Sequence, residues 1–425
     1  MKFKTQKSSL TGNVRIPGSK SHTIRAVLIA SLAEGTSYIK HPLVSSDTLS
    51  AINIYQALGA EIIEQKDCWV IKGVGKNVLT SQKTLDVGNS GTTLRLAMGS
   101  VALFADSAKI TLTGDKQICS RPIAPLIKSL NQLGADIFSP NGCAPVTISG
   151  KICGGKTQIE CQSSQYLTSL LMACPLAEND TEIIVPILNE KPYVQMTLDW
   201  LQKQGIKLTH NPQMTSFYIS GGQKYKAFST QIPADFSTAT FFLCAGAIKG
   251  NSIICSGLDL EDTQGDKKVV EYLKRMGTDI SVHTNGNITV KGGELNGIDI
   301  DMNETPDALP MMAVTACFAK GKTKLYNVAQ ARIKETDRIK VMMSELKKMG
   351  ADIEELPDGL IITGTELNSA DVCGHSDHRV VMALTIAGMM TAGSTVIDSA
   401  ESANITFPEF KDFIEKLNGQ VVAIK

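Results

Sequence analysis

The chain repeats one pattern of apolar and polar positions six times. In each copy an amphipathic segment ends at a glycine and leads into a short run rich in strand-forming residues. These glycines are spaced 69 to 75 residues apart and are Gly59, Gly134, Gly205, Gly277, Gly350 and Gly419. A glycine after the last apolar turn is typical of a helix end, because glycine enters the left-handed region without a Cβ penalty. The pattern therefore predicts six amphipathic outer helices, each followed by a strand.

A second strand-like run, closing on glycine, follows each of the first five copies. These runs read WVIKG, VTISG, FYISG, ITVKG and LIITG. No such run follows the sixth copy before Lys425, whereas NVRIPG, ending at Gly18, matches the phrase at the other end of the chain. We therefore expect residues 1–18 to supply the missing strand of the sixth repeat.

A segment that is apolar nearly all round precedes each amphipathic helix. The six segments read KSHTIRAVLIA, NSGTTLRLAMG, SSQYLTSLLMA, DFSTATFFLCA, TPDALPMMAVT and DHRVVMALTIA. A helix without a polar face belongs in a protein interior. Each repeat is thus predicted to read helix, strand, helix, strand, strand, in an α/β fold. One repeat of this length cannot cover its own buried helix, so several must pack together.

The place of the missing strand divides the six repeats into two groups of three. It predicts one domain of residues 1–18 plus 235–425 and a second domain of residues 19–234. The chain would cross between them near Ser19 and again near Pro233. The length of 425 residues alone would predict only two or three domains of ordinary size.

Composition narrows the functional classes. Hydrophobic residues make up 43% and charged residues 20%, which is typical of a globular protein. The 42 basic and 42 acidic residues balance, which argues against general nucleic-acid or polybasic membrane binding. The first residues lack the apolar core of a signal peptide, and residues 380–397 read as a buried helix followed by a strand. The ten cysteines form no CxxC pair, so we expect reduced thiols in a cytosolic protein.

The buried helices begin with the polar residues that carry the candidate chemistry. Their starts hold Lys20-Ser21, Asn89-Ser90-Gly91-Thr92, Ser163-Ser164-Gln165, Asp235, Asp307 and Asp377-His378-Arg379. Helix N-termini present unpaired N–H groups and a partial positive charge, so converging ends would bind phosphate or carboxylate. Ordinary N-capping explains the hydroxyls and carboxylates, but not the cations Lys20, Arg25, Arg95 and Arg379 within apolar segments. Buried cations need anionic partners, so we expect a strongly cationic site.

Two further motifs each leave two interpretations open. Arg121 stands before Pro122, predicted as the first residue of an outer helix, and is either an anion-binding fork or a solvated arginine. ARIKETDRIK is predicted to be helical, with Lys334 and Arg338 on one side and Glu335 beside Arg338. It is either a helix start with surface ion pairs or a carboxylate held among cations that can exchange a proton.

Other patterns argue against alternative chemistries. GNSGTT lacks the Lys-Ser/Thr of a nucleotide-binding loop. The run from His375 to Arg379 lacks a third clear metal ligand, and its arginine opposes a cation. Cys119 is either a nucleophile or a structural thiol, and the structural role is favoured.

Together these motifs resemble those of the 5-enolpyruvylshikimate-3-phosphate synthases, the 3-phosphoshikimate 1-carboxyvinyltransferases. The resemblance covers essentially the whole chain and rests on PGSKSHTIRA, GNSGTTLR, SRPI, SSQYLTSLLM, KPY, PDA, KETDR, DHR and TFP, in the family's order. It implies an inside-out α/β prism of two domains, each of three repeats around a pseudo-threefold axis, with the active site in the cleft between them. It implies transfer of the enolpyruvyl group of phosphoenolpyruvate to the 5-hydroxyl of shikimate 3-phosphate, with release of phosphate, on the shikimate pathway to chorismate and the aromatic amino acids. It implies no metal or organic cofactor, and we expect a monomer without nucleic-acid or membrane partners.

The resemblance also implies roles for the residues that match the family's motifs. Shikimate 3-phosphate would be held by Lys20, Ser21, Arg25, Ser163, Ser164, Gln165, Tyr193, Asp307 and Lys334. Phosphoenolpyruvate would be held by Lys20, Gly91, Arg121, Gln165, Arg338 and Arg379. In the catalytic set, which also includes Lys20, Asp307 would accept the proton of the attacking hydroxyl and Glu335 would give and take the proton at C3. His378 would support Glu335 and the departing phosphate.

Three positions depart from the family's pattern. Glu190 stands before KPY, where a phosphate-binding serine is common, so it is expected either to point away from the phosphate or to be partnered by a base. Ile405 stands before TFP, where many members carry a lysine near phosphoenolpyruvate. Gln330 replaces an asparagine on the shikimate side. These departures affect the expected affinities rather than the acid/base set.

Three alternatives remain open. A sister transferase acting on UDP-N-acetylglucosamine would carry Lys-Asn where this chain has Lys20-Ser21, and a loop cysteine further ahead of the Arg-Pro than Cys119. A paralogue acting on a different phosphorylated or acidic polyol is suggested by Glu190. A non-catalytic anion-binding protein is disfavoured by the presence of Asp307, Glu335 and His378 together.

Overall fold

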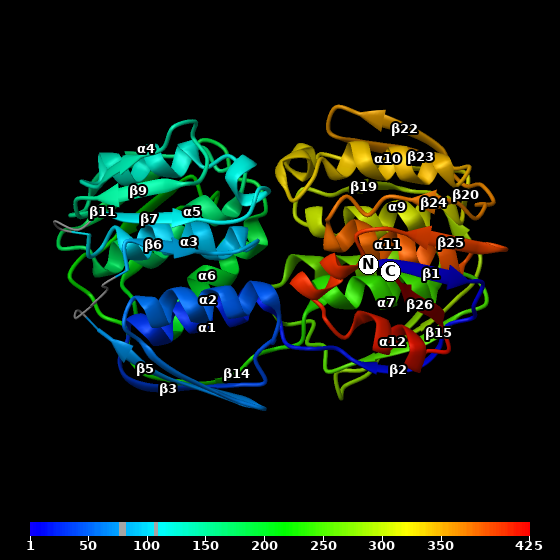
Figure 1. Ribbon diagram of the computed structural model, residues 1–425, viewed down its shortest axis with the longest axis horizontal. Helices are drawn as coiled ribbons and strands as arrows, with labels where there is room; N and C mark the ends of the chain where they lie inside the picture. Colours follow the sequence, from blue (N-terminus) through cyan, green and yellow to red (C-terminus); the bar gives the residue numbers. More distant parts are fainter. Residues whose placement is uncertain (76–81, 106–108) are drawn as a thin grey trace. The chain divides into compact units, whose positions relative to one another are not determined.

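The computed structural model describes residues 1–75, 82–105 and 109–425. The chain forms two compact units. Unit 1 consists of residues 1–17 and 233–425, and unit 2 consists of residues 18–232. Both ends of the chain lie side by side in unit 1 (Figure 1).

Unit 2, over its described residues, has three inner helices, three outer helices and three four-stranded sheets. The inner helices are α1 (Lys20–Leu32), α3 (Gly91–Val101) and α5 (Ser164–Ala173), and the outer ones are α2 (Ser46–Ala57), α4 (Ala124–Gln132) and α6 (Lys191–Lys203). The first sheet has the order β14 (Ser229–Gln231), β3 (Glu34–Lys40), β5 (Cys68–Val74), β4 (Glu61–Gln65). The second is β6 (Thr84–Asp86), β7 (Ile110–Thr113), β9 (Val146–Ser149), β8 (Asp136–Phe138). The third is β10 (Gly155–Gln158), β11 (Thr181–Ile184), β13 (Ser216–Ile219), β12 (Leu208–His210).

Unit 1 is built from the same set of elements. Its inner helices are α7 (Phe236–Ala247), α9 (Leu309–Cys317) and α11 (His378–Met389), and its outer ones are α8 (Val269–Arg275), α10 (Arg338–Lys348) and α12 (Phe410–Lys416). One sheet has the order β2 (Thr11–Arg15), β15 (Ser252–Ser256), β17 (Ile288–Lys291), β16 (Asp279–Val282). The next is β19 (Asp299–Asp301), β21 (Lys322–Tyr326), β23 (Gly359–Thr363), β22 (Asp352–Leu356). The third is β24 (Asp371–Val372), β25 (Ser394–Ile397), β1 (Lys2–Gln6), β26 (Gln420–Ile424), and a short pair joins β18 (Leu295–Asn296) to β20 (Ala319–Lys320).

All six four-stranded sheets share one pattern of pairing. The first two strands in each order are parallel, and the other two pairs are antiparallel. Each sheet therefore has a fourth, parallel strand beyond the three that the apolar pattern predicted for a repeat. Strands such as β6 and β24 have only three and two residues. Such short runs are too brief to show the period of two that marks a strand.

The N-terminal residues complete two different sheets of unit 1. Strand β1 lies between β25 and β26, with Phe3 opposite Ile397 and Ala423. Strand β2, which contains the run NVR, pairs with β15 as the parallel first strand of the fourth repeat. Residues 1–18 therefore do supply the missing strand of the sixth repeat, as predicted, but that strand is β1 and not the phrase NVRIPG. Strand β1 buries alternate residues and suits a central position, whereas only Val14 of β2 is buried.

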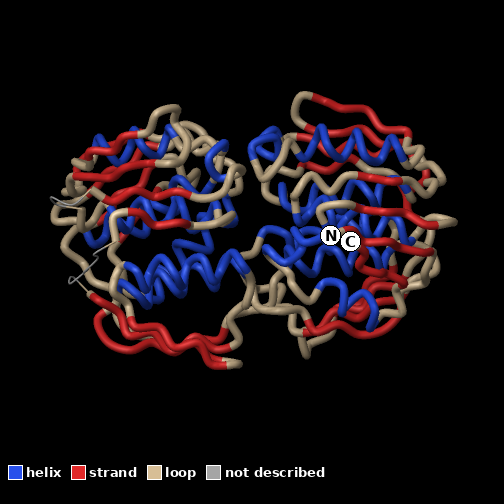
Figure 2. Tube along the Cα trace, viewed as in Figure 1, coloured by secondary structure: helices blue, strands red, loops and turns tan. Residues whose placement is uncertain are grey.

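The six apolar segments are buried helices, as predicted. Every residue of α3, α7, α9 and α11 is buried. Within each unit the inner helices contact one another and form a single hydrophobic cluster. Figure 2 shows that the strands lie mainly on the outer sides of each unit, around the helices. The inner helices of a unit therefore share one core, and their N-terminal ends carry the polar residues described below.

Five of the six repeat glycines adopt the left-handed conformation that the helix ends require. Their φ values are between 71° and 115°. In the sixth repeat Asn418 has the left-handed φ of 66°, so the prediction for Gly419 was wrong by one residue. Gly419 is needed for a different reason, because a Cβ there would lie 2.4 Å from Cγ2 of Ile414.

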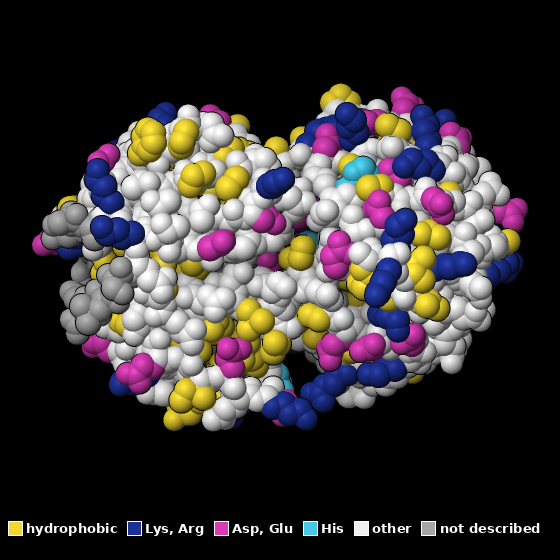
Figure 3. Space-filling view, viewed as in Figure 1, with side chains coloured by type: hydrophobic (Ala, Val, Ile, Leu, Met, Phe, Trp, Pro, Cys, Tyr) yellow, Lys and Arg dark blue, Asp and Glu magenta, His cyan; other side chains and the backbone are white. Residues whose placement is uncertain are grey.

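No helix among the described residues is long and apolar enough to cross a membrane. Residues 380–397 form most of α11 followed by β25, as predicted. On the face of unit 1 visible in Figure 3, Lys and Arg side chains are mixed with Asp and Glu side chains. This mixing agrees with the balanced composition.

Candidate functional site

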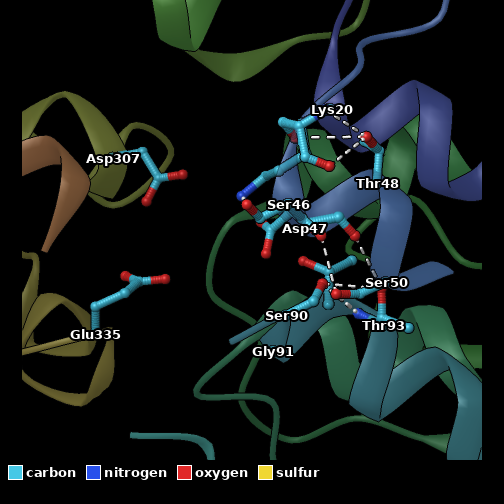
Figure 4. A network of polar contacts seen from close by, with 12 residues as sticks. Lys20, Ser46, Asp47, Thr48, Ser50, Ser90, Gly91, Thr93, Asp307 and Glu335 are labelled. Atoms are coloured by element: carbon cyan, nitrogen blue, oxygen red, sulfur yellow. Dashed lines mark hydrogen bonds and ion pairs between the residues drawn. The ribbon is translucent and has the colours of Figure 1, made fainter. Parts of the chain in front are cut away.

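Lys20 opens helix α1 of unit 2 and forms an ion pair with Asp47. Its Nζ lies 2.9 Å from Oδ2 of Asp47, and the two side chains are only 15% and 6% exposed. Asp47 lies in the first turn of α2, next to the start of α3 with Ser90 and Gly91 (Figure 4). The pattern of the inner helices did not predict Asp47, because it belongs to an outer helix. The need of a buried cation for an anionic partner is the one signal that called for such a residue.

Arg25 connects helix α1 to α5 and α6. It is 2% exposed, and it donates hydrogen bonds to oxygens of Ser21, Thr168, Tyr193 and Thr197. Burial lowers the pKa of Arg25 to about 10, against the raising effect of Tyr193. All four acceptors are neutral carbonyl or hydroxyl oxygens. A buried guanidinium held in this way favours a nearby anion, and two of the other predicted binding residues, Ser21 and Tyr193, are already in contact with it.

Gly91 brings the start of helix α3 against two guanidinium groups. A Cβ at this position would lie 2.5 Å from Nη1 of Arg95 and 2.6 Å from Nη1 of Arg121. Arg95 donates to the carbonyl oxygen of Gly91 over 2.9 Å and to Oε1 of Gln165 over 3.1 Å, and it lies over the ring of Tyr166. Three residues predicted to bind phosphoenolpyruvate, Gly91, Arg121 and Gln165, are therefore adjacent. Arg95, which joins them, was noticed in the sequence but was not assigned to the site.

The segment around Arg121 differs from the predicted helix start. Helix α4 begins at Ala124, with Pro125 in its first turn, so Pro122 is not its first residue. Arg121 is 6% exposed, which excludes the solvated arginine considered from the sequence. Cys119 is half-buried, and its Sγ lies 3.5 Å from the carbonyl oxygen of Gly114, in keeping with a structural thiol.

Glu190, the residue before helix α6, contacts the N-terminus of helix α5 through its side chain. Its Oε2 accepts hydrogen bonds from the backbone N–H of Ser164 over 3.1 Å and from the Ser164 hydroxyl over 2.7 Å. Ser163 is the N-cap, and its side chain accepts from the N–H of Gln165. The Glu190 carboxylate thus contacts Ser164, one of the residues predicted to bind shikimate 3-phosphate. Its Oε2 is held by an N–H and a hydroxyl of the helix start.

Arg338 in unit 1 binds three carboxylates. Its guanidinium nitrogens lie 2.9 Å from Asp307, 2.5 Å from Glu335 and 2.8 Å from Asp377. The Arg338 side chain is 1% exposed. Burial lowers its pKa, but the carboxylates of Asp377, Glu335 and Asp307 together raise the pKa above the ordinary arginine value. The guanidinium of Arg338 thus contacts both predicted acid/base residues, Asp307 and Glu335.

Arg379 adds a second cation to this cluster. Its Nη2 lies 2.9 Å from Oδ2 of Asp307. It follows His378, the buried first residue of α11. Asp377 caps that helix through the backbone N–H of Arg379 and also binds Arg338. The cap and the ion pair explain why this carboxylate is fully buried.

The KETDR segment is not helical before Arg338. Residues Ala329–Ile333 form a 3-10 helix, and α10 begins at Arg338. The prediction that Lys334 and Arg338 share a helix side was therefore wrong, although the contact between Glu335 and Arg338 is present. The turn between the two helices projects Glu335 toward the guanidinium, and Figure 4 shows the carboxylates of Asp307 and Glu335 on neighbouring segments of unit 1.

Three further residues that the sequence analysis singled out in unit 1 are half-buried or buried: Lys334, Gln330 and Ile405. Lys334 is half-buried in the turn before α10. Gln330 is 4% exposed and donates to the carbonyl oxygen of Asn303 over 3.0 Å. Ile405 is half-buried at the end of the 3-10 helix Ala400–Ile405.

A further buried carboxylate, which the sequence pattern missed, belongs to this part of unit 1. Asp266 is 1% exposed and accepts a short hydrogen bond from the Ser237 hydroxyl. Burial and the charge of Asp307 raise the pKa of Asp266 to about 7, although Arg379 acts to lower it. With Asp307, Glu335 and Asp377, carboxylates outnumber the two arginines here. The cations that the sequence predicted for the site therefore lie mainly in unit 2, as Lys20, Arg25, Arg95 and Arg121.

Known proteins resemble this chain over its full length. Residues 4–414 match the family described as EPSP synthase (3-phosphoshikimate 1-carboxyvinyltransferase). A protein of Acetivibrio thermocellus named 3-phosphoshikimate 1-carboxyvinyltransferase is 52% identical over 423 residues, which is 99% of each chain. A protein of the same name from Methanocaldococcus jannaschii is 43% identical over 420 residues, 97% of each chain. The structure of an EPSP synthase from Acinetobacter baumannii has a TM-score of 0.83 with 28% identity and covers 100% of both chains.

The sequence match and the structural likeness extend over both units. The match includes every segment that carries a predicted site residue, from Lys20 to Arg379. The chain therefore belongs to the EPSP synthase family, the 3-phosphoshikimate 1-carboxyvinyltransferases.

Proposed function

We propose that this protein transfers the enolpyruvyl group of phosphoenolpyruvate to the 5-hydroxyl of shikimate 3-phosphate and releases inorganic phosphate. The family membership supports this activity. The observation that carries it in the structure is the pairing of Asp307 and Glu335 on the single guanidinium of Arg338, at 2.9 and 2.5 Å. The reaction needs one group to take a proton from an oxygen and another to exchange a proton with a carbon, and two fixed carboxylates meet that need.

The proposed binding residues come from both units. Lys20, Ser21, Arg25, Ser163, Ser164, Gln165 and Tyr193 of unit 2 hold shikimate 3-phosphate, together with Asp307 and Lys334 of unit 1. Lys20, Gly91, Arg121 and Gln165 of unit 2 hold phosphoenolpyruvate, together with Arg338 and Arg379 of unit 1. Supporting this assignment, Arg25 contacts Ser21 and Tyr193, and Gly91 lies beside Arg121. Both substrates carry several negative charges, which such guanidinium and ammonium groups bind well.

The proposed chemistry proceeds in two steps. In the first, the 5-hydroxyl oxygen bonds to C2 of phosphoenolpyruvate while Asp307 takes the hydroxyl proton and Glu335 gives a proton to C3. In the second, C3 returns a proton to Glu335 as the bond from C2 to the phosphate oxygen breaks, and phosphate leaves with the proton that Asp307 took in the first step. Lys20 and His378 stabilise the departing phosphate, and His378 also positions Glu335. No metal or organic cofactor takes part in this scheme.

The fold proposed for each unit is the inside-out α/β prism. Three equal sheets and three shared inner helices in each unit support it. The monomeric state and the cytosolic location stay predictions from the sequence.

An assay of phosphate release from phosphoenolpyruvate tests the activity. We expect turnover with shikimate 3-phosphate as co-substrate and none with UDP-N-acetylglucosamine or with phosphoenolpyruvate alone. Lack of turnover with shikimate 3-phosphate would refute the proposal, and turnover with a different phosphorylated polyol alone would assign the chain to another acceptor.

The variant Glu335→Gln tests the acid/base assignment. The amide keeps the size of the side chain and a hydrogen-bond acceptor for Arg338, but it cannot exchange a proton with C3. We expect kcat to fall by at least about 100-fold while the Kd for shikimate 3-phosphate changes by less than about threefold. Calorimetric binding and steady-state rates measure the two effects, and the exposed residue Glu409, changed to Gln, serves as the control. An unchanged kcat in Glu335→Gln would show that Glu335 does not carry the proton.

A further inference from the structure

The carboxylate of Glu190 already occupies hydrogen-bond donors at the start of helix α5. One oxygen, Oε2, accepts from both the N–H and the hydroxyl of Ser164, at 3.1 and 2.7 Å. The Glu190 side chain is 2% exposed, so this is a buried contact rather than a surface one. A carboxylate in this place also gains from the partial positive charge of a helix N-terminus. The free protein thus holds an anion of its own where an N-terminus favours one.

The backbone around Glu190 is built to hold this position. Glu190 has a left-handed φ of 58°, which is uncommon for a residue other than glycine. The preceding segment is tied to the chain before α5, because Asn189 N–H donates to the carbonyl of Cys161. The carbonyl of Glu190 accepts from the N–H of Tyr193, whose own carbonyl binds Arg25. The contact with Ser164 is therefore part of an ordered turn and not the chance pose of a long side chain.

The proposed function gives Ser164 to shikimate 3-phosphate, whose phosphate is its strongest acceptor, so this inference rests on that function. Ser164 has one hydroxyl proton and one backbone N–H, and each can be donated to only one strong acceptor at a time. A phosphate and a carboxylate that share these donors also repel each other at a distance of a few ångströms. Shikimate 3-phosphate therefore either displaces Glu190 from Ser164 or binds against its charge.

We propose that Glu190 is a specificity-determining residue, an internal anion that competes with the phosphate of shikimate 3-phosphate for the start of helix α5. It weakens binding of the phosphorylated acceptor and does not take part in proton transfer. The KM for phosphoenolpyruvate is expected to stay unchanged, because Gly91 and Arg121, proposed for that substrate, lie against each other at the start of helix α3, away from Ser164. The effect of Glu190 is thus confined to the KM of one substrate.

The variant Glu190→Gln separates charge from shape. Its amide oxygen can still accept from Ser164, while the competing charge is gone. We expect the KM and the Kd for shikimate 3-phosphate to fall by at least about tenfold, with kcat and the KM for phosphoenolpyruvate within about twofold of the parent protein. Glu182→Gln removes the same charge from strand β11 of the same unit, where the side chain pairs with Lys156, and is expected to leave all four constants unchanged.

A purely structural role for Glu190 has a different signature. If the carboxylate only caps helix α5, the Gln variant melts at a lower temperature while its affinity for shikimate 3-phosphate is unchanged or weaker, and this result overturns the inference. Glu190→Ser, which is smaller and supplies a hydroxyl, is measured in parallel and decides the question if the Gln variant does not fold. Its affinity is expected to rise, and an unchanged or weaker affinity counts against the inference.

The parent protein distinguishes failure of the inference from failure of the proposed function. Turnover of shikimate 3-phosphate by the parent, with unchanged affinity in both Glu190 variants, refutes the competition and leaves the function intact. A parent protein that neither binds nor turns over shikimate 3-phosphate refutes both.

Discussion

Arg338 forms ion pairs with carboxylates from three separate segments of unit 1, and each carboxylate has a different position in the fold. Asp377 caps helix α11, Glu335 lies in the turn before α10, and Asp307 also binds Arg379. Removing one partner of such a buried cluster leaves an uncompensated charge, which typically costs about 3–5 kcal/mol. The arrangement explains why these polar residues are tolerated beside a hydrophobic core. It also means that a ligand anion at Arg338 meets a cation already bound by carboxylates.

Gly91 offers a test at the residue scale. A methyl group here would lie 2.5 and 2.6 Å from the guanidinium nitrogens of Arg95 and Arg121, which are the ends of flexible side chains. We therefore expect Gly91→Ala to fold normally but to displace both guanidiniums, raising the KM for phosphoenolpyruvate by at least about tenfold with little change for shikimate 3-phosphate. Steady-state kinetics with each substrate varied in turn measure the split.

Gly99 on the same helix is the matched control for that substitution. A Cβ there would lie 2.7 Å from Oγ of Ser169 and 2.9 Å from its backbone oxygen, which cannot move easily. Gly99→Ala is expected to lower the melting temperature without a selective effect on either KM. Equal effects of Gly91→Ala on both KM values would contradict the proposed division of the binding residues.

At the scale of the elements, the outer helices were predicted well because each leaves several signals in sequence. An amphipathic stretch, a closing glycine and a following strand recur together, and five of the six glycines have the expected left-handed φ. The end of the sixth outer helix shows the limit of the glycine signal. There Asn418 adopts the left-handed conformation, one residue before Gly419. Apart from β2, the strands before the inner helices were not predicted, since runs as short as two or three extended residues carry no period.

Gly205, at the end of helix α6, tests the conformational requirement by itself. It has a φ of 71°, and no atom lies within 4 Å of the position that a Cβ would take. Gly205→Ala should therefore lower the free energy of unfolding by about 1 kcal/mol through backbone strain alone. Gly205→Asn should lose less than the alanine variant, because asparagine tolerates the left-handed region better. Urea denaturation of the three proteins measures the order, and equal stability of all three would argue against strain at this helix end.

At the scale of the whole molecule, the repeats predicted the number of inner helices but not the contacts that their starts make. Periodicity indicates which face of a segment is buried, yet it does not tell which distant side chain lies beside it. Asp47, Asp266 and the contact of Glu190 with Ser164 are of this kind, because each pairs residues from different elements. In unit 2, Arg25 contacts Ser21 and Gly91 lies beside Arg121, as the family motifs predicted. These contacts could be predicted because both residues of each pair belong to a motif.

The stability of the whole protein should respond to pH through Asp266. Burial first, then Asp307 and Asp235, raise the pKa of this carboxyl to about 7, whereas Arg379 and Ser237 lower it. The native state therefore keeps a proton that the unfolded chain releases near pH 4. Between about pH 4 and pH 7 the native state binds more protons, so the contribution of Asp266 to the free energy of unfolding falls as the pH rises through this window.

Asp266→Asn removes this dependence while keeping an oxygen for the Ser237 hydroxyl. We expect the variant to gain stability relative to the parent on going from about pH 5 to about pH 8, by roughly 2–4 kcal/mol. Urea denaturation at these two pH values measures the gain. Parallel stability curves for the two proteins would show that Asp266 does not titrate differently in the folded state.

The position of β1 between β25 and β26 also bears on the order in which the protein folds during synthesis. Residues 18–232 contain every strand and inner helix of unit 2, so this unit can fold once they have left the ribosome. Strand β1 is made before unit 2 but finds its two neighbours only when residues 394–424 are made. A strand that is made before unit 2 is therefore among the last to reach its native place, and Phe3 stays outside its core until then.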